Sequence, residues 1–249
     1  MTPWAALAIF GAGLAAGTIN TIVGSGSLIT FPTLLALGYP PILANVSNNV
    51  GLVPGSASGV VAYRRELDGQ RSRLLTLGAA SLSGGITGAV LLLALPSSVF
   101  KAAIPALVLL AAVLMAVQPR ISAWLAGRGE RQVHGGPLLL VGVFLTGVYG
   151  GYFGAAQGIL LLAILTIGLD ETLQRANGVK NLLAGLANLV AGVVFAFAAP
   201  HVDWTAAGLL AAGAISGGVL GARFGRALSP TALRALIVAV GIVAIVRLL

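Results

Sequence analysis

The sequence predicts an all-α polytopic membrane protein made of two inverted repeats, each with a glycine-broken helical hairpin and about three spanning helices. Charged residues make up 8% of the chain and hydrophobic residues 58%, whereas a soluble domain carries about 25% charged residues. Such a chain cannot cover a core with polar side chains, so we expect it to lie in lipid. Long apolar runs and an internal repeat are the other two observations behind this prediction.

The apolar runs give the expected helices in order. Most of the long ones approach the ~20 residues that a helix needs to cross a bilayer. Two shorter runs each follow a glycine-rich break, and each is about half a bilayer long as helix. The short runs are Leu28–Leu37 and Ile159–Ile167. The long runs are Trp4–Val23, Ile42–Tyr63, Leu74–Leu95, Val99–Val117, Gly136–Tyr152, Ala176–Ala199, Trp204–Ala222 and Thr231–Leu248.

The second half of the chain repeats the first. GTINTIVGSGSLITFPTLLALG, from Gly17 to Gly38, aligns with GVYGGYFGAAQGILLLAILTIG, from Gly147 to Gly168. After a two-residue insertion, Ala44-Asn45 falls on Ala176-Asn177, and SGGITGA then falls on SGGVLGA. We therefore expect a first transmembrane repeat over residues 1–122, a polar cytoplasmic linker over 123–135, and a second, inverted repeat over 136–249.

Arginine placement predicts the inversion. Loops 64–73 and 119–135 are rich in arginine and are separated by two expected spans, so the positive-inside rule places both in the cytoplasm. In the second half the counterpart of loop 64–73 is Ala199–Trp204, which has no Lys or Arg, and the arginines flank the other loops. Inverted topology predicts this exchange of charge between the two sides.

Inversion requires an odd number of crossings in each half. Either Trp4–Leu37 is a hairpin that enters and returns, followed by three spans, or the short run also crosses and each half has five. We favour the hairpin, because ten residues are too few to cross comfortably. Both arrangements place the two chain termini outside.

The glycine-rich breaks are the first candidate binding region. Unpaired N–H and C=O groups inside hydrocarbon are tolerated only where protein covers them or where they line a polar cavity. The helix that starts after a break directs free N–H groups and partial positive charge toward that cavity, which suits an anion. Glycines allow close approach and positive φ, and a serine can cap the helix; the alternative is that the glycines serve helix packing. The candidates are Gly24, Ser25, Gly26, Ser27, Gly154 and Gln157.

Lys180 is the second candidate, because it lies inside an expected span that holds no carboxylate. A charge within the membrane costs about 2.5–3.5 kcal/mol on insertion scales and is a functional hypothesis by default. Lys180 then supplies a fixed cation for an anionic substrate; the alternative is that it snorkels to the cytoplasmic interface. Nearby asparagines either bind substrate or join helices. They are Asn20, Asn48, Asn49 and Asn181.

Several functional classes are disfavoured. All six acidic residues lie in or beside expected loops, so no buried acid–base pair supports an enzyme and no buried carboxylate is placed to hold sodium or relay protons. Cysteine is absent and the two histidines are isolated, so we expect no metal and no cofactor. The net charge of +8 comes from short loops without interleaved aromatics, which disfavours nucleic acid. The expected partners are a small anion and the lipid bilayer.

Two stretches carry a family resemblance. GLAAGTINTIVGSGSLITFPTLLALGYPP with ANVSNNVGLVPGSASGVVAYRREL, and later GVYGGYFGAAQGILLLAILTIGLDETLQRANGVKNLLAGLANLVAGVVF, closely resemble the two signatures of the TauE/SafE family of sulfite exporters. The resemblance covers nearly the whole chain. It implies a carrier of the bacterial inner membrane for sulfite, sulfoacetate, thiosulfate or a related sulfonate. By position it implies glycine-rich turns at Gly24-Ser25-Gly26 and Gly154-Ala155-Ala156, and polar pairs at Asn48-Asn49 and Lys180-Asn181. Many relatives have lysine where this chain has Asn49.

These observations together predict a transporter that exports a small sulfur-containing anion by alternating access. A negative cell interior drives a monoanion outward by about 2.3 kcal/mol per 100 mV, so export needs no coupling ion. The alternatives are an anion channel that uses the same site, a membrane-embedded enzyme, and a membrane assembly partner that transports nothing.

Overall fold

The computed structural model describes residues 1–22, 26–126 and 136–224. Within these ranges the chain is helical and contains no strands. The predicted span Thr231–Leu248 lies outside the described residues, as does most of the predicted linker. The helices are α1 (Pro3–Ile22), α2 (Ser27–Ala36), α3 (Pro41–Ala62), the 3₁₀ helix η1 (Arg64–Leu67), α4 (Arg71–Ala94), α5 (Ser97–Ala126), α6 (Pro137–Tyr152), α7 (Gln157–Gly168), α8 (Leu173–Ala198) and α9 (Trp204–Phe224).

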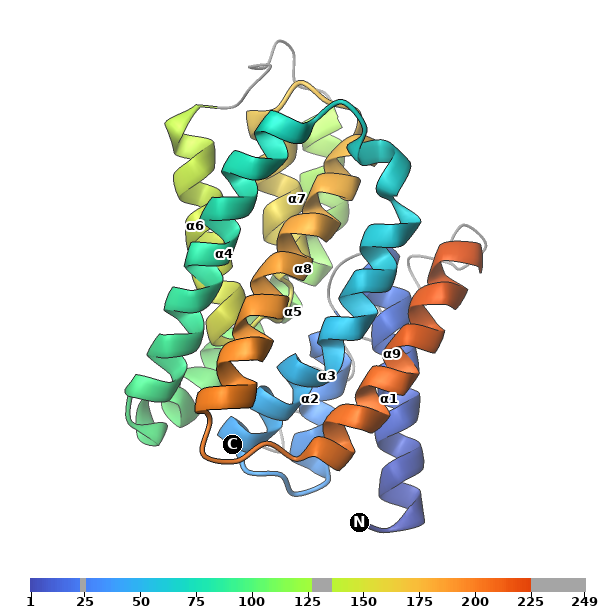
Figure 1. The fold of residues 1–249 in the computed structure, drawn as a ribbon, viewed down its shortest axis with the longest axis vertical. Coiled ribbons are helices and arrows are strands. Elements are labelled where there is room, and N and C mark those ends of the chain that lie inside the picture. The colour runs from blue at the N-terminus through green and yellow to red at the C-terminus, as the bar shows by residue number, and fades with distance from the viewer. Residues whose placement is uncertain (23–25, 127–135, 225–249) are drawn as a thin grey trace.

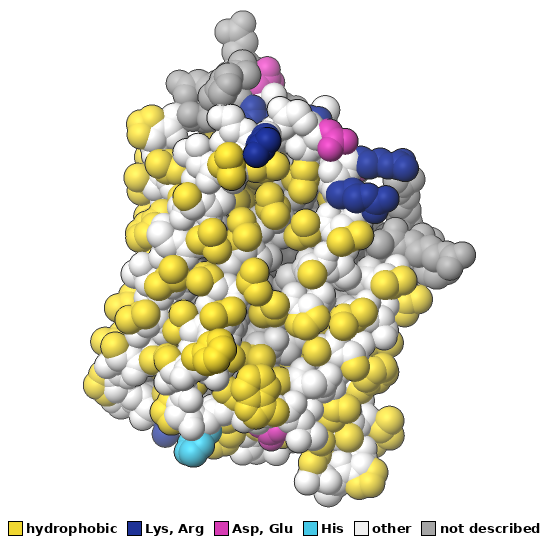
Figure 2. All heavy atoms as spheres, viewed as in Figure 1, with side chains coloured by type: hydrophobic (Ala, Val, Ile, Leu, Met, Phe, Trp, Pro, Cys, Tyr) yellow, Lys and Arg dark blue, Asp and Glu magenta, His cyan; other side chains and the backbone are white. Residues whose placement is uncertain are grey.

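The all-helical, multi-pass prediction is confirmed. Among the described residues, five helices are long and apolar enough to cross a membrane: α1, α4, α5, α8 and α9. Helix α3 is also long, with 22 residues, but its polar side chains lower its hydropathy. Figure 2 shows hydrophobic side chains spread over the length of the bundle, with most of the visible Lys and Arg side chains near one end. This distribution is that of a bundle surrounded by lipid.

Helix α5 extends further than its apolar run. The run predicts an end near Val117, whereas α5 has 30 residues and continues to Ala126. Hydropathy falls after Val117, but helix α5 does not end there. The first residues of the predicted linker are therefore helical.

The two ends of the bundle differ in their side chains. One end carries Arg64, Arg65 and Arg71, and we call it the arginine end. The other carries Tyr39 and Asp203, and we call it the tyrosine end.

Close glycine contacts establish the direction of the first hairpin. The glycines of α9 approach α1 in ascending order along both helices, so the two are parallel: Gly213 at Phe10, Gly217 at Leu14 and Gly221 at Thr18. Helix α9 begins beside Asp203, at the tyrosine end, so α1 begins there too. Helix α2 ends just before Tyr39, at the same end. Helices α1 and α2 therefore form a hairpin that opens at the tyrosine end of the bundle (Figure 1).

The second hairpin enters from the other end. Helices α4 and α6 are also parallel, with Gly84 at Phe144 and Gly88 at Val148. Helix α4 starts at the arginine end, so α6 starts there, and α7 ends just before Glu171 at that same end. In Figure 1 the two hairpins open at opposite ends of the bundle. Opposite entrance is what the inverted-repeat hypothesis requires, and the two-fold relation itself stays a prediction.

The repeated SGG motifs join the two halves crosswise. The first motif, on α4, packs on α6, and the second, on α9, packs on α1. A Cβ at Gly84 would collide with the backbone oxygen of Phe144, and one at Gly217 with that of Leu14. Phe144 and Leu14 are themselves aligned by the repeat. Small residues let these backbones touch, which is how membrane helices associate without a hydrophobic driving force.

Two alanine substitutions on α9 are predicted to have opposite effects on stability. Gly217→Ala places a methyl group against the backbone of α1, an overpacking that costs about 1–3 kcal/mol. Gly208 has nothing within 4 Å of an added Cβ, so Gly208→Ala gains about 0.8–1 kcal/mol of helix propensity. Thermal unfolding in detergent should show a lower midpoint for the first variant and a higher one for the second. Equal midpoints would contradict the close α1–α9 packing.

Candidate functional site

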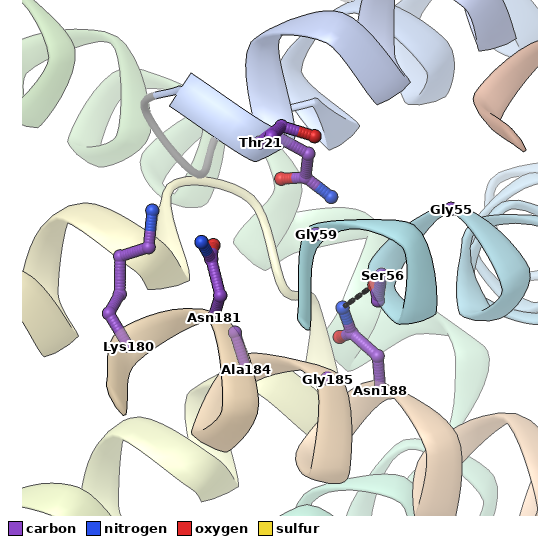
Figure 3. Close-up of a pocket in the computed structure, with 10 residues that line it drawn as sticks. Thr21, Gly55, Ser56, Gly59, Lys180, Asn181, Ala184, Gly185 and Asn188 are labelled. Atoms are coloured by element: carbon purple, nitrogen blue, oxygen red, sulfur yellow. Dashed lines mark hydrogen bonds between the residues drawn. The ribbon is translucent and has the colours of Figure 1, made fainter. Parts of the chain in front are cut away.

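A polar pocket lies where α3 and α8 cross beneath the end of α1 (Figure 3). Glycine and alanine on α3 and α8 let the two helices approach, and the polar side chains of all three helices face the remaining space. Figure 3 shows Lys180 and Asn181 side by side on α8, with their side-chain ends directed toward Thr21. The lining residues are Asn20, Thr21, Gly55, Ser56, Gly59, Lys180, Asn181, Ala184, Gly185 and Asn188.

Lys180 is the only charged residue among the described residues that line this pocket. Its side chain is fully buried, at 0% exposure, and its Nζ has no hydrogen-bond partner among the described residues. The ammonium therefore lies inside the protein and does not reach the interface as snorkelling would require. A buried charge without a counter-charge is strongly unfavourable. The described residues of the pocket offer Lys180 neither a hydrogen-bond acceptor nor a counter-charge.

Amides and hydroxyls surround the lysine. Asn181 is buried and its Nδ2 has no hydrogen-bond partner within the described chain. Asn188 donates from Nδ2 to Ser56 Oγ over 3.3 Å, and this bond ties α8 to α3 (Figure 3). The register that places Asn45 on Asn177 also places Ser56 on Asn188, so two repeat counterparts bond to each other. Sequence reasoning did not select Thr21, Ser56 or Asn188. The matched polarity of Ser56 and Asn188 was the available signal.

The first glycine break differs in detail from the prediction. Gly24 and Ser25 lie outside the described residues. Gly26 has φ −58°, in the right-handed region, so the prediction of a positive φ there is wrong. Gly26 is required for packing instead, because an added Cβ would lie 2.6 Å from the backbone oxygen of Ala16. Ser27 is the first residue of α2 and does not cap it; Asn20 Oδ1 accepts from the Gly26 N–H at 3.2 Å.

The second break does use left-handed backbone. Gly154 has φ +80° and Ala156 has φ +61°, an uncommon conformation for alanine. The Tyr149 hydroxyl donates to the Ala155 carbonyl at 2.6 Å and holds this turn. Gln157 begins α7, is buried, and its side chain lies against Gly150, the repeat counterpart of Asn20. In the α6–α7 hairpin, Gln157 of α7 therefore lies where Asn20 of α1 lies in the α1–α2 hairpin.

The predicted site residues fall into two groups. Asn20, Lys180 and Asn181 line the pocket, while Asn48, Asn49, Gly154 and Gln157 do not. In the second group Asn48, Asn49 and Gln157 are buried. Gly26 and Ser27 do not line the pocket either. The Oδ1 atoms of Asn48 and Asn49 lack partners among the described residues. Asn188 connects the groups, since its Oδ1 lies 4.0 Å from an added Cβ at Gly154.

The cavity is small. It measures about 20 Å³, which is room for about one water molecule. A sulfur oxyanion has several heavy atoms and does not fit unless α1, α3 or α8 moves. The pocket is therefore contracted relative to the size of such an anion, with the buried Lys180 side chain in its wall.

A lipid-facing helical bundle with a polar, lysine-lined pocket among its helices is typical of a membrane transporter. The sequence model of the family described as sulfite exporter TauE/SafE matches residues 9–248. The chain belongs to the TauE/SafE family. No solved structure matches it.

Curated relatives also match over nearly the full length. "Probable membrane transporter protein ORF9" of Sinorhizobium is 30% identical and aligns with 97% of this chain and 91% of its own. "Probable membrane transporter protein YfcA" of Escherichia coli K12 is 27% identical, over 97% of this chain and 88% of its own. A relative in Haemophilus influenzae, named only as a probable membrane transporter protein, is 28% identical over 92% of this chain and 89% of its own. These names support a transporter, and they specify no substrate.

Proposed function

We propose that this protein exports a small sulfur-containing anion, such as sulfite, thiosulfate, sulfoacetate or a related sulfonate, across the bacterial inner membrane by alternating access. The observation that carries the proposal is Lys180, a fully buried cation that lines a pocket and has no partner in the described chain. Anion binding there offsets the desolvation of both charges. On this proposal the side-chain amides of Asn20 and Asn181, which line the same pocket, donate to the anion's oxygens.

One lysine favours a substrate with a single negative charge near Lys180. The described residues of the pocket include no second cation, and Asn49 stands where many family members have lysine. The contracted cavity supports a carrier over a channel, because a channel requires a continuous aqueous path. On this proposal the arginine end faces the cytoplasm, as the positive-inside rule indicates. Export then follows the membrane potential for a monoanion.

A ligand screen tests the substrate class. Purified protein in detergent would be heated with sulfite, thiosulfate, sulfoacetate, taurine, sulfate or acetate. A ligand at a hundred times its dissociation constant stabilises the folded state by about 2.7 kcal/mol, which corresponds to a midpoint shift of roughly 5–11 °C in a chain of this size. We expect the shift with one or more of the sulfur-containing anions. Stabilisation by acetate alone would overturn the sulfur assignment.

A further inference from the structure

An ion-pair cluster closes the arginine end. Glu171, in the loop between α7 and α8, binds Arg73 at the start of α4 through Oε1 at 2.8 Å and Arg175 on α8 through Oε2 at 2.7 Å. Arg175 also donates to the Asp68 carbonyl at 3.1 Å. Burial by itself would raise the pKa of Glu171, but the hydrogen bonds from Arg73 and Arg175 outweigh burial and lower that pKa. Glu171 is therefore ionised at neutral pH. We call Arg73, Glu171 and Arg175 the arginine latch.

A different contact closes the tyrosine end. The Tyr39 hydroxyl, in the loop between α2 and α3, donates to Asp203 Oδ2 at 2.9 Å. The Asp203 N–H donates to Ser47 Oγ on α3 at 2.9 Å. Asp203 Oδ1 also accepts from the Ala206 N–H and caps the start of α9. We call Tyr39, Ser47 and Asp203 the tyrosine latch.

The two latches occupy corresponding places in the repeats. Each joins the loop after the short hairpin helix of one half to the start of a long helix of the other half: the loop after α7 to α4, and the loop after α2 to α9. Each also adjoins a helix that carries the polar groups of the interior. Arg175 is on α8 with Lys180, and Ser47 is on α3 beside Asn48. Opening a latch would therefore free one hairpin and one of the two helices that cross at the pocket.

We propose that the arginine latch and the tyrosine latch are the two gates of the transport path, and that they open alternately. This inference rests on the proposed function. Both latches are formed in this structure, and the pocket between them is contracted. A carrier must keep one gate closed while the other is open, because two open gates would make a leak. Two separate latches, each holding the hairpin of a different half, provide that control.

The two gates differ in chemistry, which gives each a separate signature. The arginine latch pairs full charges that are partly exposed, with side-chain exposures of 9% for Arg73, 17% for Glu171 and 33% for Arg175. Such pairs weaken as salt is added, because the Debye length falls from about 10 Å at 0.1 M to about 3 Å at 1 M. The tyrosine latch depends on an uncharged hydroxyl donor and responds less to salt.

Cysteine labelling tests this directly, because the natural sequence contains no cysteine. Ala184→Cys places one thiol in the pocket wall, and we call it the pocket thiol. Protein in sealed vesicles of each orientation would be treated with a membrane-impermeant maleimide, with Arg65→Cys marking the arginine end and Lys101→Cys the opposite end. We expect slow labelling of the pocket thiol from both sides in the otherwise natural chain, and faster labelling from the arginine side at 1 M salt.

Two conservative variants separate the gates. Adding Glu171→Gln should raise the labelling rate of the pocket thiol at least tenfold from the arginine side only. Adding Tyr39→Phe should raise it from the tyrosine side only. Arg175→Gln leaves the pair of Arg73 and Glu171 in place and should give a smaller rise than Glu171→Gln. Arg71→Gln, at an exposed arginine outside the latch, is the matched control and should change nothing.

The results decide between a gate and a structural contact. Unchanged rates, equal increases from both sides, or an increase from the wrong side would each overturn the proposal. Failure of the proposed function has another signature, namely sided labelling that responds to the latch variants in a protein that no sulfur anion stabilises. Conversely, sulfur anions that stabilise a protein with unresponsive labelling would leave the substrate assignment standing and remove the gates.

Discussion

Lys180→Met is expected to weaken anion binding strongly while leaving the fold intact. Methionine keeps an unbranched side chain of similar length and removes the charge. Hydrogen bonds to charged groups contribute about 1.5–3 kcal/mol, so affinity for the sulfur anion should fall between about tenfold and about 150-fold. Stability without ligand should stay the same or rise, since replacing a buried charge by a packed apolar group is often neutral or stabilising.

The measurement is the ligand-induced shift of the unfolding midpoint, followed by anion efflux from loaded vesicles. Lys101→Met is the matched control, because Lys101 is the only other lysine in the sequence and its side chain is exposed at the start of α5. It should bind and transport like the natural chain. If Lys180→Met kept full affinity, the buried ammonium would not be the anion's partner. If it unfolded instead, Lys180 would have an undetected structural role.

Most of the fold could be predicted from the sequence, because a lipid environment restricts the secondary structures that the chain can adopt. Backbone groups in lipid must bond internally, so an apolar run becomes a helix and its length decides whether it crosses. That reasoning predicted α1 to α9, including the short helices α2 and α7 that follow the glycine breaks. It missed the extension of α5 to Ala126, because hydropathy falls after Val117 while the helix continues.

The site was predicted only in part, because the crossing of α3 and α8 decides which polar groups meet. Lys180 is conspicuous on any hydropathy plot, whereas Ser56 is an ordinary small residue until α8 brings Asn188 within 3.3 Å. The backbone at Gly26 could not be deduced either. Packing against Ala16 explains that glycine as fully as a strained turn would, and only the dihedral angle distinguishes the two.

Residues that the repeat aligns with each other also contact each other where α3 and α8 cross. Gly185 on α8 faces Val60 on α3, and the counterparts of these two residues, Val53 and Gly192, also face each other. The bond between Ser56 and Asn188 also joins two counterparts. At the crossing of α3 and α8, residues of one repeat therefore contact their own counterparts in the other repeat. A binding site at that point is shared by both halves. On the proposed function, such a site would change its side of access when the two halves rock about it, as in inverted-repeat transporters.

Gly59→Leu is expected to block transport by filling the pocket. An added Cβ at Gly59 would lie 3.9 Å from the Asn181 amide and 4.0 Å from Thr21 Oγ1, which is ordinary van der Waals contact. Gly59→Ala should therefore fold and retain binding. The further carbons of leucine must enter a cavity of about 20 Å³, where they compete with the anion. Overpacking of about 1–3 kcal/mol in the bound state corresponds to roughly 5- to 150-fold weaker binding.

Comparing Gly59→Ala with Gly59→Leu separates a blocked pocket from a general loss of stability. Alanine and leucine both have a higher helix propensity than the glycine they replace. Any fall in the unfolding midpoint without ligand should therefore come only from overpacking around residue 59. Gly208→Leu, at a site with nothing within 4 Å, controls for adding a large apolar side chain to the bundle. We expect Gly59→Ala and Gly208→Leu to transport and Gly59→Leu to fail. Because Gly59 carries no polar group, loss of transport in the leucine variant alone would show that the substrate passes between α1, α3 and α8. Equal transport by the alanine and leucine variants would place its path elsewhere.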